Sequence, residues 1–199
     1  MATQPKHFVT VEEYLAAEEA SLDRHEYLDG EVFAMSGASP RHGQIAVNIL
    51  VELGLQLRNS NCRVRNVDTR LATSPSGLYS YADVLIACKP EKFQSDTLLN
   101  PVVIVEVLSP STGNYDRGAK FERYRQIPSF REYLIVAQDR VYVEHHVRAG
   151  APGQSVWTMR EFTSSDDVIN FQSVGVQLPC STIYSDLDFQ SDSGQQQQS

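Results

Sequence analysis

Two acidic residues stand beside strongly apolar segments, where a carboxylate needs a partner. Glu106 lies near the end of the apolar run 101–107, and Asp83 directly precedes the apolar run 84–87. A carboxylate buried without a partner is costly, so such groups are usually paired, protonated or bound to a metal ion. Together with Lys120 from a following helical segment, these two acids are the residue types of a divalent-metal site that activates water. The lysine would stabilise the developing negative charge.

A structural interpretation of the same residues stays open. Asp83 would cap a turn and Glu106 would form an ion pair with Lys120, because structural ion pairs also occur at such places. Glu31, which follows the Asp29-Gly30 turn, is either a solvent-facing strand residue or a third acid near the metal. Metal binding by the intact chain separates the two interpretations.

The segments that position these residues are predicted to be strands and amphipathic helices. The β-branched residues 102–105, bounded by prolines, predict a strand buried on both faces of a sheet. Ser39 and Pro40 predict a helix start, and apolar residues recur every four positions after them, as in one buried stripe. Further segments are a helix at 10–20, a hairpin at 24–35, strands at 62–73, 81–87, 131–137, 141–148, 156–160, 168–169 and 174–176, a polar loop at 89–100 and a closing turn at 179–187. This order predicts an α/β fold with a mixed central β-sheet flanked by helices.

Length and composition limit the number of domains and the classes of protein that this chain can belong to. A chain of 199 residues predicts one domain, here 1–189, followed by a Gln/Ser-rich tail at 190–199 that we expect to be disordered. The sequence contains neither an apolar run long enough to span a membrane nor a signal peptide, so we expect a cytoplasmic protein. The formal net charge of −8 argues against an extended nucleic-acid surface but leaves room for a local basic groove.

Cysteine and histidine usage predicts neither disulfides nor zinc. Cys62, Cys88 and Cys180 are few, odd in number and far apart, so we expect reduced, packed thiols. The five histidines are scattered as well, and no Cys/His set has the spacing of zinc ligands.

The ordered motifs of the chain resemble one family, the Uma-two family of bacterial restriction-endonuclease-like proteins. The resemblance covers roughly Thr10 to Leu187 and rests on Tyr27-Leu28-Asp29-Gly30-Glu31, Ser39-Pro40-Arg41-His42, Tyr81-Ala82-Asp83-Val84, the segment from Asn100 to Thr112, Asp116-Arg117-Gly118-Ala119-Lys120-Phe121 and Tyr124. That family is similar to the PD-(D/E)XK nucleases. The similarity implies a restriction-endonuclease-like fold and hydrolysis of nucleic-acid phosphodiester bonds. The expected substrate is DNA, and the expected cofactor is Mg²⁺ or Mn²⁺.

Carried onto this sequence, the resemblance assigns a role to each candidate residue. Asp83 matches the first acid and Glu106 the second, and the backbone carbonyl of Val107 would be a further metal ligand, with Glu31 as an outer one. The lysine expected two residues after Glu106 is Leu108, so its role passes to Lys120. A lysine from another element can serve, because the chemistry depends on position rather than on sequence order. From their clustering in the sequence, Arg63, Arg65, Arg70 and Arg117 form either a local basic groove or a solvated charged face; in the first case they, with His42, are the residues expected to contact nucleic acid.

Three further expectations accompany this hypothesis. Ala82 replaces the proline before the first acid, a residue that shapes the backbone and carries no chemistry. Nucleases that cut duplexes often act as dimers, so we expect a homodimer by analogy. The alternative function is a catalytically inactive binding or regulatory module with the nuclease fold. A serine hydrolase using Ser109 or Ser111 with Lys120 is disfavoured, because the chain has no GxSxG motif.

Overall fold

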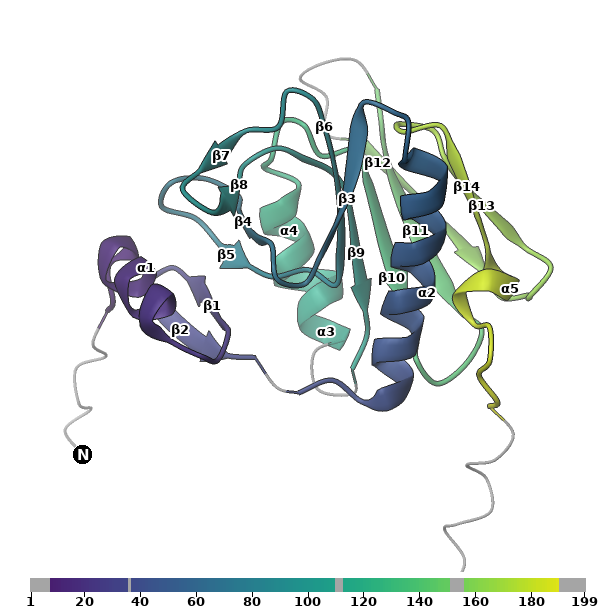
Figure 1. The fold of residues 1–199 in the computed structure, drawn as a ribbon, viewed down its shortest axis with the longest axis horizontal. Coiled ribbons are helices and arrows are strands. Elements are labelled where there is room, and N and C mark those ends of the chain that lie inside the picture. Colours follow the sequence, from purple (N-terminus) through teal and green to yellow (C-terminus); the bar gives the residue numbers. More distant parts are fainter. Residues whose placement is uncertain (1–7, 36, 110–112, 151–155, 190–199) are drawn as a thin grey trace, which may run out of the picture.

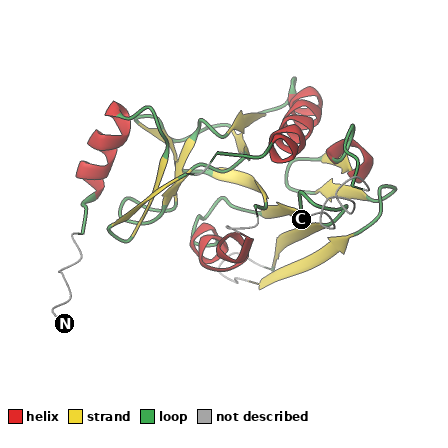
Figure 2. Ribbon diagram, turned by 90° about the horizontal axis from the view of Figure 1, so that it is seen from below, coloured by secondary structure: helices red, strands yellow, loops and turns green. Residues whose placement is uncertain are grey.

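The fold is built on a six-stranded central sheet that carries helices on both faces (Figures 1 and 2). A computed structural model of the chain describes residues 8–35, 37–109, 113–150 and 156–189. The strands, in sheet order, are β12 (Val156–Phe162), β11 (Val143–Ala149), β10 (Glu132–Val136), β9 (Pro101–Val107), β6 (Val84–Cys88) and β3 (Cys62–Asn66). β9 and β10 pair in parallel and the other neighbours are antiparallel, so the predicted mixed central sheet is confirmed.

The parallel pair at the centre requires a crossover, and helical turns supply it. Between β9 and β10 the chain forms α3 (Gly113–Tyr115), a π-helical segment (Asp116–Lys120) and α4 (Phe121–Tyr124). Every residue of β10 is buried, and β9 is nearly so, which matches the rule that parallel strands lie covered on both faces.

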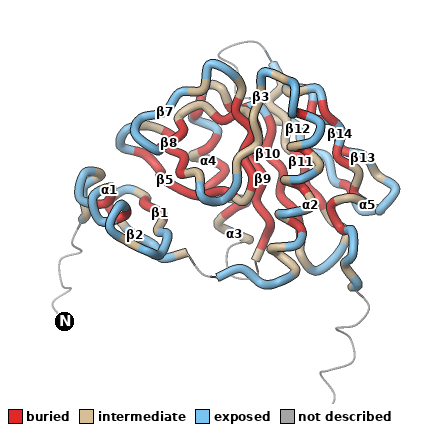
Figure 3. The backbone as a smooth tube through the Cα atoms, in the orientation of Figure 1, coloured by how far each residue is buried: buried red, intermediate tan, exposed pale blue. Residues whose placement is uncertain are grey.

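Two layers of helix cover the two faces of this sheet. On one face lies α2 (Pro40–Leu57), whose buried residues Ile45, Ile49, Leu53 and Leu57 form the predicted stripe. The hairpin β13 (Val168–Phe171) and β14 (Val176–Pro179) and the short α5 (Cys180–Ile183) pack into the same core. On the other face, a second core gathers Phe121, Tyr124 and Tyr133 under the crossover helices. Figure 3 shows the buried backbone running through the central strands.

A second mixed sheet stands beside the first and was not predicted. Its strands, in order, are β2 (Glu31–Ala34), β1 (His25–Leu28), β5 (Tyr79–Ser80), β4 (Arg70–Ala72), β8 (Thr97–Leu98) and β7 (Phe93–Gln94). The helix α1 (Val11–Ala20) packs on it through Tyr14, which contacts Tyr27 and Tyr79. The prediction of a loop at 89–100 was wrong where β7 and β8 pair, since two-residue strands are too short to show a period.

Several local predictions are confirmed. Thr10 and Glu13 form the capping box that starts α1, and the Ser39 hydroxyl accepts the N–H of His42 at the start of α2. Asp29 and Gly30 both have positive φ, as their tight hairpin turn requires. Over the described ranges, no helix is both long and apolar enough to cross a membrane. The predicted tail 190–199 and Ser111 lie outside the described residues.

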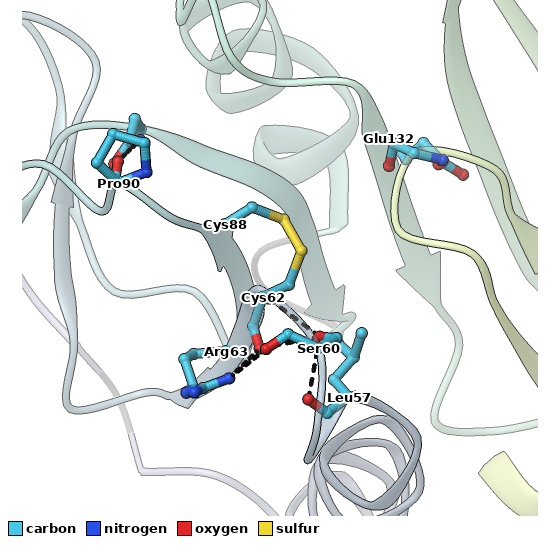
Figure 4. The surroundings of a disulfide bond; sticks show 9 residues. Leu57, Ser60, Cys62, Arg63, Cys88, Pro90 and Glu132 are labelled. Atoms are coloured by element: carbon cyan, nitrogen blue, oxygen red, sulfur yellow. Dashed lines mark hydrogen bonds between the residues drawn. A yellow bond between two sulfur atoms is a disulfide. The ribbon is translucent and has the colours of Figure 1, made fainter.

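The expectation of three reduced thiols was wrong. Cys62 on β3 lies directly opposite Cys88 on β6, and the two form a disulfide (Figure 4). Strand register brings them together across a sequence separation of 26, and spacing alone does not reveal register. Cys180 is a buried free thiol, and burial raises its pKa to about 11.

Candidate active site

Asp83 lies just before β6, and its side chain contacts both β9 and α2. Its Oδ2 accepts a hydrogen bond of 2.7 Å from the N–H of Val107, the last residue of β9. Its Oδ1 lies 2.9 Å from Nε2 of His42, in the first turn of α2. Because β6 and β9 are neighbours in the sheet, Asp83 and Val107 meet at the same end of the two strands.

His42 lies at this carboxylate because the Ser39 cap fixes the start of α2. Its side chain and that of Asp83 are largely shielded, at 14% and 13% exposure. Burial lowers the pKa of His42, but the hydrogen bond and charge of Asp83, with the charge of Asp116, raise it above its ordinary value. The pairing therefore strengthens as His42 becomes protonated.

A buried cluster centred on Lys120 lies on the face of the sheet that carries α3 and α4. The Nζ atom of Lys120 lies 3.0 Å from Oε1 of Glu106 and 2.8 Å from Oε1 of Glu26. Asp116, one turn earlier in the π-helical segment, is 3.7 Å away. The Tyr124 hydroxyl donates to the same Glu106 oxygen at 2.9 Å. We call Glu26, Glu106, Asp116 and Lys120 the acid–lysine cluster.

The cluster holds more acids than bases. Burial raises the pKa of Glu106 well above its ordinary value, and the charges of Asp116, Asp83 and Glu26 raise it further against the opposing Lys120. Burial alone would lower the pKa of Lys120, but the surrounding carboxylates, Glu106 first, raise it overall. Lys120 is therefore a permanent cation that cannot compensate all three acids at once.

The donor chemistry of these residues suits a hard divalent cation. Asp83 and Glu106 offer carboxylate oxygens, the Val107 carbonyl adds a backbone oxygen, and Mg²⁺ prefers such ligands. Among the described residues, no three His, Cys, Asp or Glu side chains gather closely enough to hold a metal ion by themselves. Asp83, Glu106 and the Val107 carbonyl are therefore candidate ligands only, and a metal ion bound there would need water and a substrate phosphate as further ligands.

The hairpin contributes an acid that was not predicted, Glu26, and the role expected of Glu31 stays a prediction. Glu31 begins β2 opposite Leu28, whereas Glu26 on β1 is the acid that reaches Lys120. Directly paired residues share a face, and Glu26 and Leu28 are two positions apart, so both glutamates face the same way, with Glu31 about 7 Å nearer the turn. Strand alternation identifies the face, but only the docking of the hairpin on the helix selects Glu26.

The five residues predicted to contact nucleic acid are all held by partners within the protein. Their partners are Glu91 for Arg65 (2.8 Å), Glu144 for Arg117 (2.7 Å), the Thr97 hydroxyl for buried Arg70 (2.9 Å), the Ser60 and Cys62 carbonyls for Arg63 (both 2.9 Å), and Asp83 for His42 (2.9 Å). Contact of these side chains with nucleic acid stays a prediction.

The sequence is similar to a known protein family and to proteins of one organism. The model of the Uma2 family, described as "Putative restriction endonuclease", matches residues 11–181. The chain is 32% identical over 179 residues to "Uncharacterized protein slr1290" of Synechocystis sp., with 89% of this chain and 92% of that protein covered. It is 31% identical over 174 residues to "Uncharacterized protein sll1609" of the same organism, with 86% and 97% covered.

One solved structure shares the fold. It is the crystal structure of "a putative nuclease belonging to DUF820" from Anabaena variabilis, with a TM-score of 0.71 and 14% sequence identity. The match covers 89% of this chain and 98% of that one. The likeness therefore extends over nearly all of both chains and confirms the predicted restriction-endonuclease-like α/β architecture.

Proposed function

The chain belongs to the Uma2 (Uma-two) family, and from that premise we propose that it is a metal-dependent endonuclease that hydrolyses nucleic-acid phosphodiester bonds. One observation carries the proposal: Lys120 Nζ lies 3.0 Å from Glu106 Oε1 although the two residues come from different elements. Lys120 would therefore take the role of the lysine that is absent from position 108. Geometry, not sequence order, decides whether a side chain can serve.

Asp83, Glu106 and the carbonyl of Val107 would hold Mg²⁺ or Mn²⁺. A bound divalent cation lowers the pKa of its water and neutralises charge on the phosphate under attack. The Val107 amide holds Asp83 at the end of β9, and the Tyr124 hydroxyl holds Glu106. These hydrogen bonds orient both carboxylates before substrate arrives, which favours catalysis.

Lys120 would stabilise the negative charge that develops on the phosphate. Its position is fixed by the ion pair with Glu26, at 2.8 Å, so the ammonium group keeps one anchor if Glu106 turns toward a metal ion. A preorganised cation in a shielded site is worth more than one in water. Glu26 is a positioning residue in this scheme.

Cleavage of supercoiled plasmid DNA tests the proposal. The wild type is expected to cut in Mg²⁺ or Mn²⁺ and to stop when a chelator is added, whereas Asp83→Asn and Glu106→Gln are expected to lose activity at least about 100-fold. Glu132→Gln, which alters a buried acid outside the cluster, is the matched control and should cut normally. Cleavage by Asp83→Asn at the wild-type rate would contradict the proposal.

Two observations favour the alternative of an inactive binding module with the nuclease fold. Both oxygens of Asp83 already take hydrogen bonds, from Val107 and at His42, and the formal net charge is −8. A module of this kind would bind no Mn²⁺ at Glu106 and would cut no nucleic acid in any metal. The homodimer and the cytoplasmic location expected from the sequence stay predictions.

A further inference from the structure

Three arginines converge at the end of α4 and the adjoining ends of β10 and β11. The side chain of Arg148 donates to the carbonyl of Arg125, and the N–H of Arg148 donates to the carbonyl of Arg131 at 2.8 Å. The N–H of Arg131 in turn donates to Val102 at the start of β9. We call Arg125, Arg131 and Arg148 the arginine patch.

The arginine patch has no acid partner within the described part of the chain. Arg65 and Arg117 do have one, in Glu91 and Glu144, whereas the Arg131 side chain donates only to backbone carbonyls, that of Pro128 at 3.0 Å and that of Phe130 at 3.4 Å. Burial lowers the pKa of Arg148, and the positive charges of Arg131 and Arg125 lower it further. The patch therefore concentrates uncompensated positive charge on a chain whose formal net charge is −8, which favours an anionic partner.

Aromatic rings support two of the three guanidinium groups. Arg148 lies 5.1 Å from the ring centre of Trp157, and Arg125 lies 5.6 Å from that of Phe121. Such stacking holds the planar fork of arginine in place. Arg125 and Arg131 are exposed and Arg148 is half-buried, so the patch is accessible to a partner. A guanidinium fork matches phosphate oxygens in pairs.

The patch and the acid–lysine cluster lie toward opposite ends of β9. The N–H of Arg131 bonds to Val102, which is four residues before Glu106 on this strand, a span of about 13 Å at 3.3 Å per residue. One strand of duplex DNA carries a phosphate about every 3.4 Å along the axis. A strand whose scissile phosphate lies at Lys120 would therefore reach the patch about four nucleotides away.

We propose that the arginine patch binds the phosphate backbone of a nucleic-acid strand a few nucleotides from the scissile phosphate. This inference rests on the proposed nuclease function and adds the surface that holds the substrate. It adds the arginine patch to Arg63, Arg65, Arg70, Arg117 and His42, whose contact with nucleic acid stays a prediction.

Binding of a labelled 20-base-pair DNA duplex over a series of salt concentrations tests the inference. The variant Arg125→Gln/Arg131→Gln changes two exposed side chains, and Arg140→Gln is the control, since Arg140 is an exposed arginine that pairs with Asp139. The double variant is expected to bind at least about tenfold more weakly and to lower the slope of log K against log salt by about 2. Arg140→Gln should bind like the wild type.

Two outcomes would overturn the inference. One is a double variant that is folded by circular dichroism and keeps wild-type affinity and salt slope, and the other is a wild type that does not bind the duplex. The plasmid cleavage assay separates this failure from that of the proposed function. Metal-dependent cutting that Glu106→Gln abolishes, together with unchanged binding by the double variant, would reject the arginine patch and leave the nuclease standing.

Discussion

Two buried groups of charged residues lie on opposite faces of the central sheet and differ in their ratio of acid to base. On the α2 face, Glu132 pairs with His145 at 2.6 Å, and its other oxygen accepts the N–H of Ser173 at 2.7 Å. His145 contacts the ring of Phe171, at 5.2 Å between centres. This pair is one acid and one base, each with partners, inside an apolar core.

On the other face, three acids of the acid–lysine cluster share one base. Lys120 lies within 4 Å of Glu26, Glu106 and Asp116, as the distances of 2.8, 3.0 and 3.7 Å show. Breaking a balanced buried pair costs stability, whereas a surplus of acid is itself unfavourable and is relieved by a cation or a proton. Imbalance of charge, rather than burial, therefore distinguishes a candidate site from a structural ion pair.

The largest effect is expected from Lys120→Met. Removing the cation should lower the rate of metal-dependent cleavage by about 100- to 1,000-fold, because no other described ammonium group lies at Glu106. Single-turnover cleavage by wild type, Lys120→Met and Glu132→Gln checks this. A Lys120→Met enzyme as fast as Glu132→Gln would remove the functional distinction between the two faces.

The balanced pair should show the opposite behaviour. Glu132 is fully buried, so Glu132→Gln replaces a charged hydrogen bond to His145 and is expected to lower the free energy of unfolding by roughly 2–3 kcal/mol. Cleavage per folded molecule should stay unchanged. Urea unfolding with a parallel activity assay measures both, and an activity loss without a stability loss would contradict the structural role.

A smaller effect is expected on the pH dependence of stability, through Glu106. Its pKa is raised well above the ordinary 4.5 in the folded protein, so between 4.5 and the folded value the native state binds more protons than the unfolded state. Stability therefore falls as pH rises through that window. Glu106→Gln should gain stability relative to wild type as pH increases from 4.5, and denaturant unfolding at several pH values would show it. A difference independent of pH would contradict the raised pKa.

The smallest effect concerns His42. Its pKa is raised by Asp83 against the opposing effect of burial, so its contribution to stability is fully present below the ordinary value of 6.5 and is lost as pH rises through the folded pKa. The destabilisation caused by His42→Gln should accordingly be larger at pH 5.5 than at pH 8.5. An equal effect at both pH values would exclude a protonated His42 in this pair.

Sequence patterns predicted the elements better than their contacts. The β9 strand, the stripe of α2 and the Asp29-Gly30 turn follow from local periodicity and turn chemistry, which act within a few residues. Asp83 and Glu106 were identified because an acid beside an apolar strand is costly. The role of Glu26 and the Cys62–Cys88 disulfide depend instead on docking and strand register, which link distant parts of the chain.

The arginines also show that sequence patterns do not reveal the contacts between distant residues. Clusters in sequence, such as Arg63 with Arg65, suggested a basic surface, but their side chains are held within the protein. Arg131 and Arg148 are 17 positions apart in the sequence and meet only because β10 and β11 are paired. A cluster of charges formed by residues on different strands cannot be recognised from their positions in the sequence.

Calorimetric titration of Mn²⁺ into wild type, Glu106→Gln and Glu132→Gln tests the central claim most directly. The titrations are run alone and with a short DNA duplex, since a substrate phosphate completes many such sites. Wild type and Glu132→Gln are expected to bind Mn²⁺, and Glu106→Gln is expected to lose this binding. Equal binding by all three proteins, or none by wild type even with the duplex, would contradict a metal site at Asp83 and Glu106.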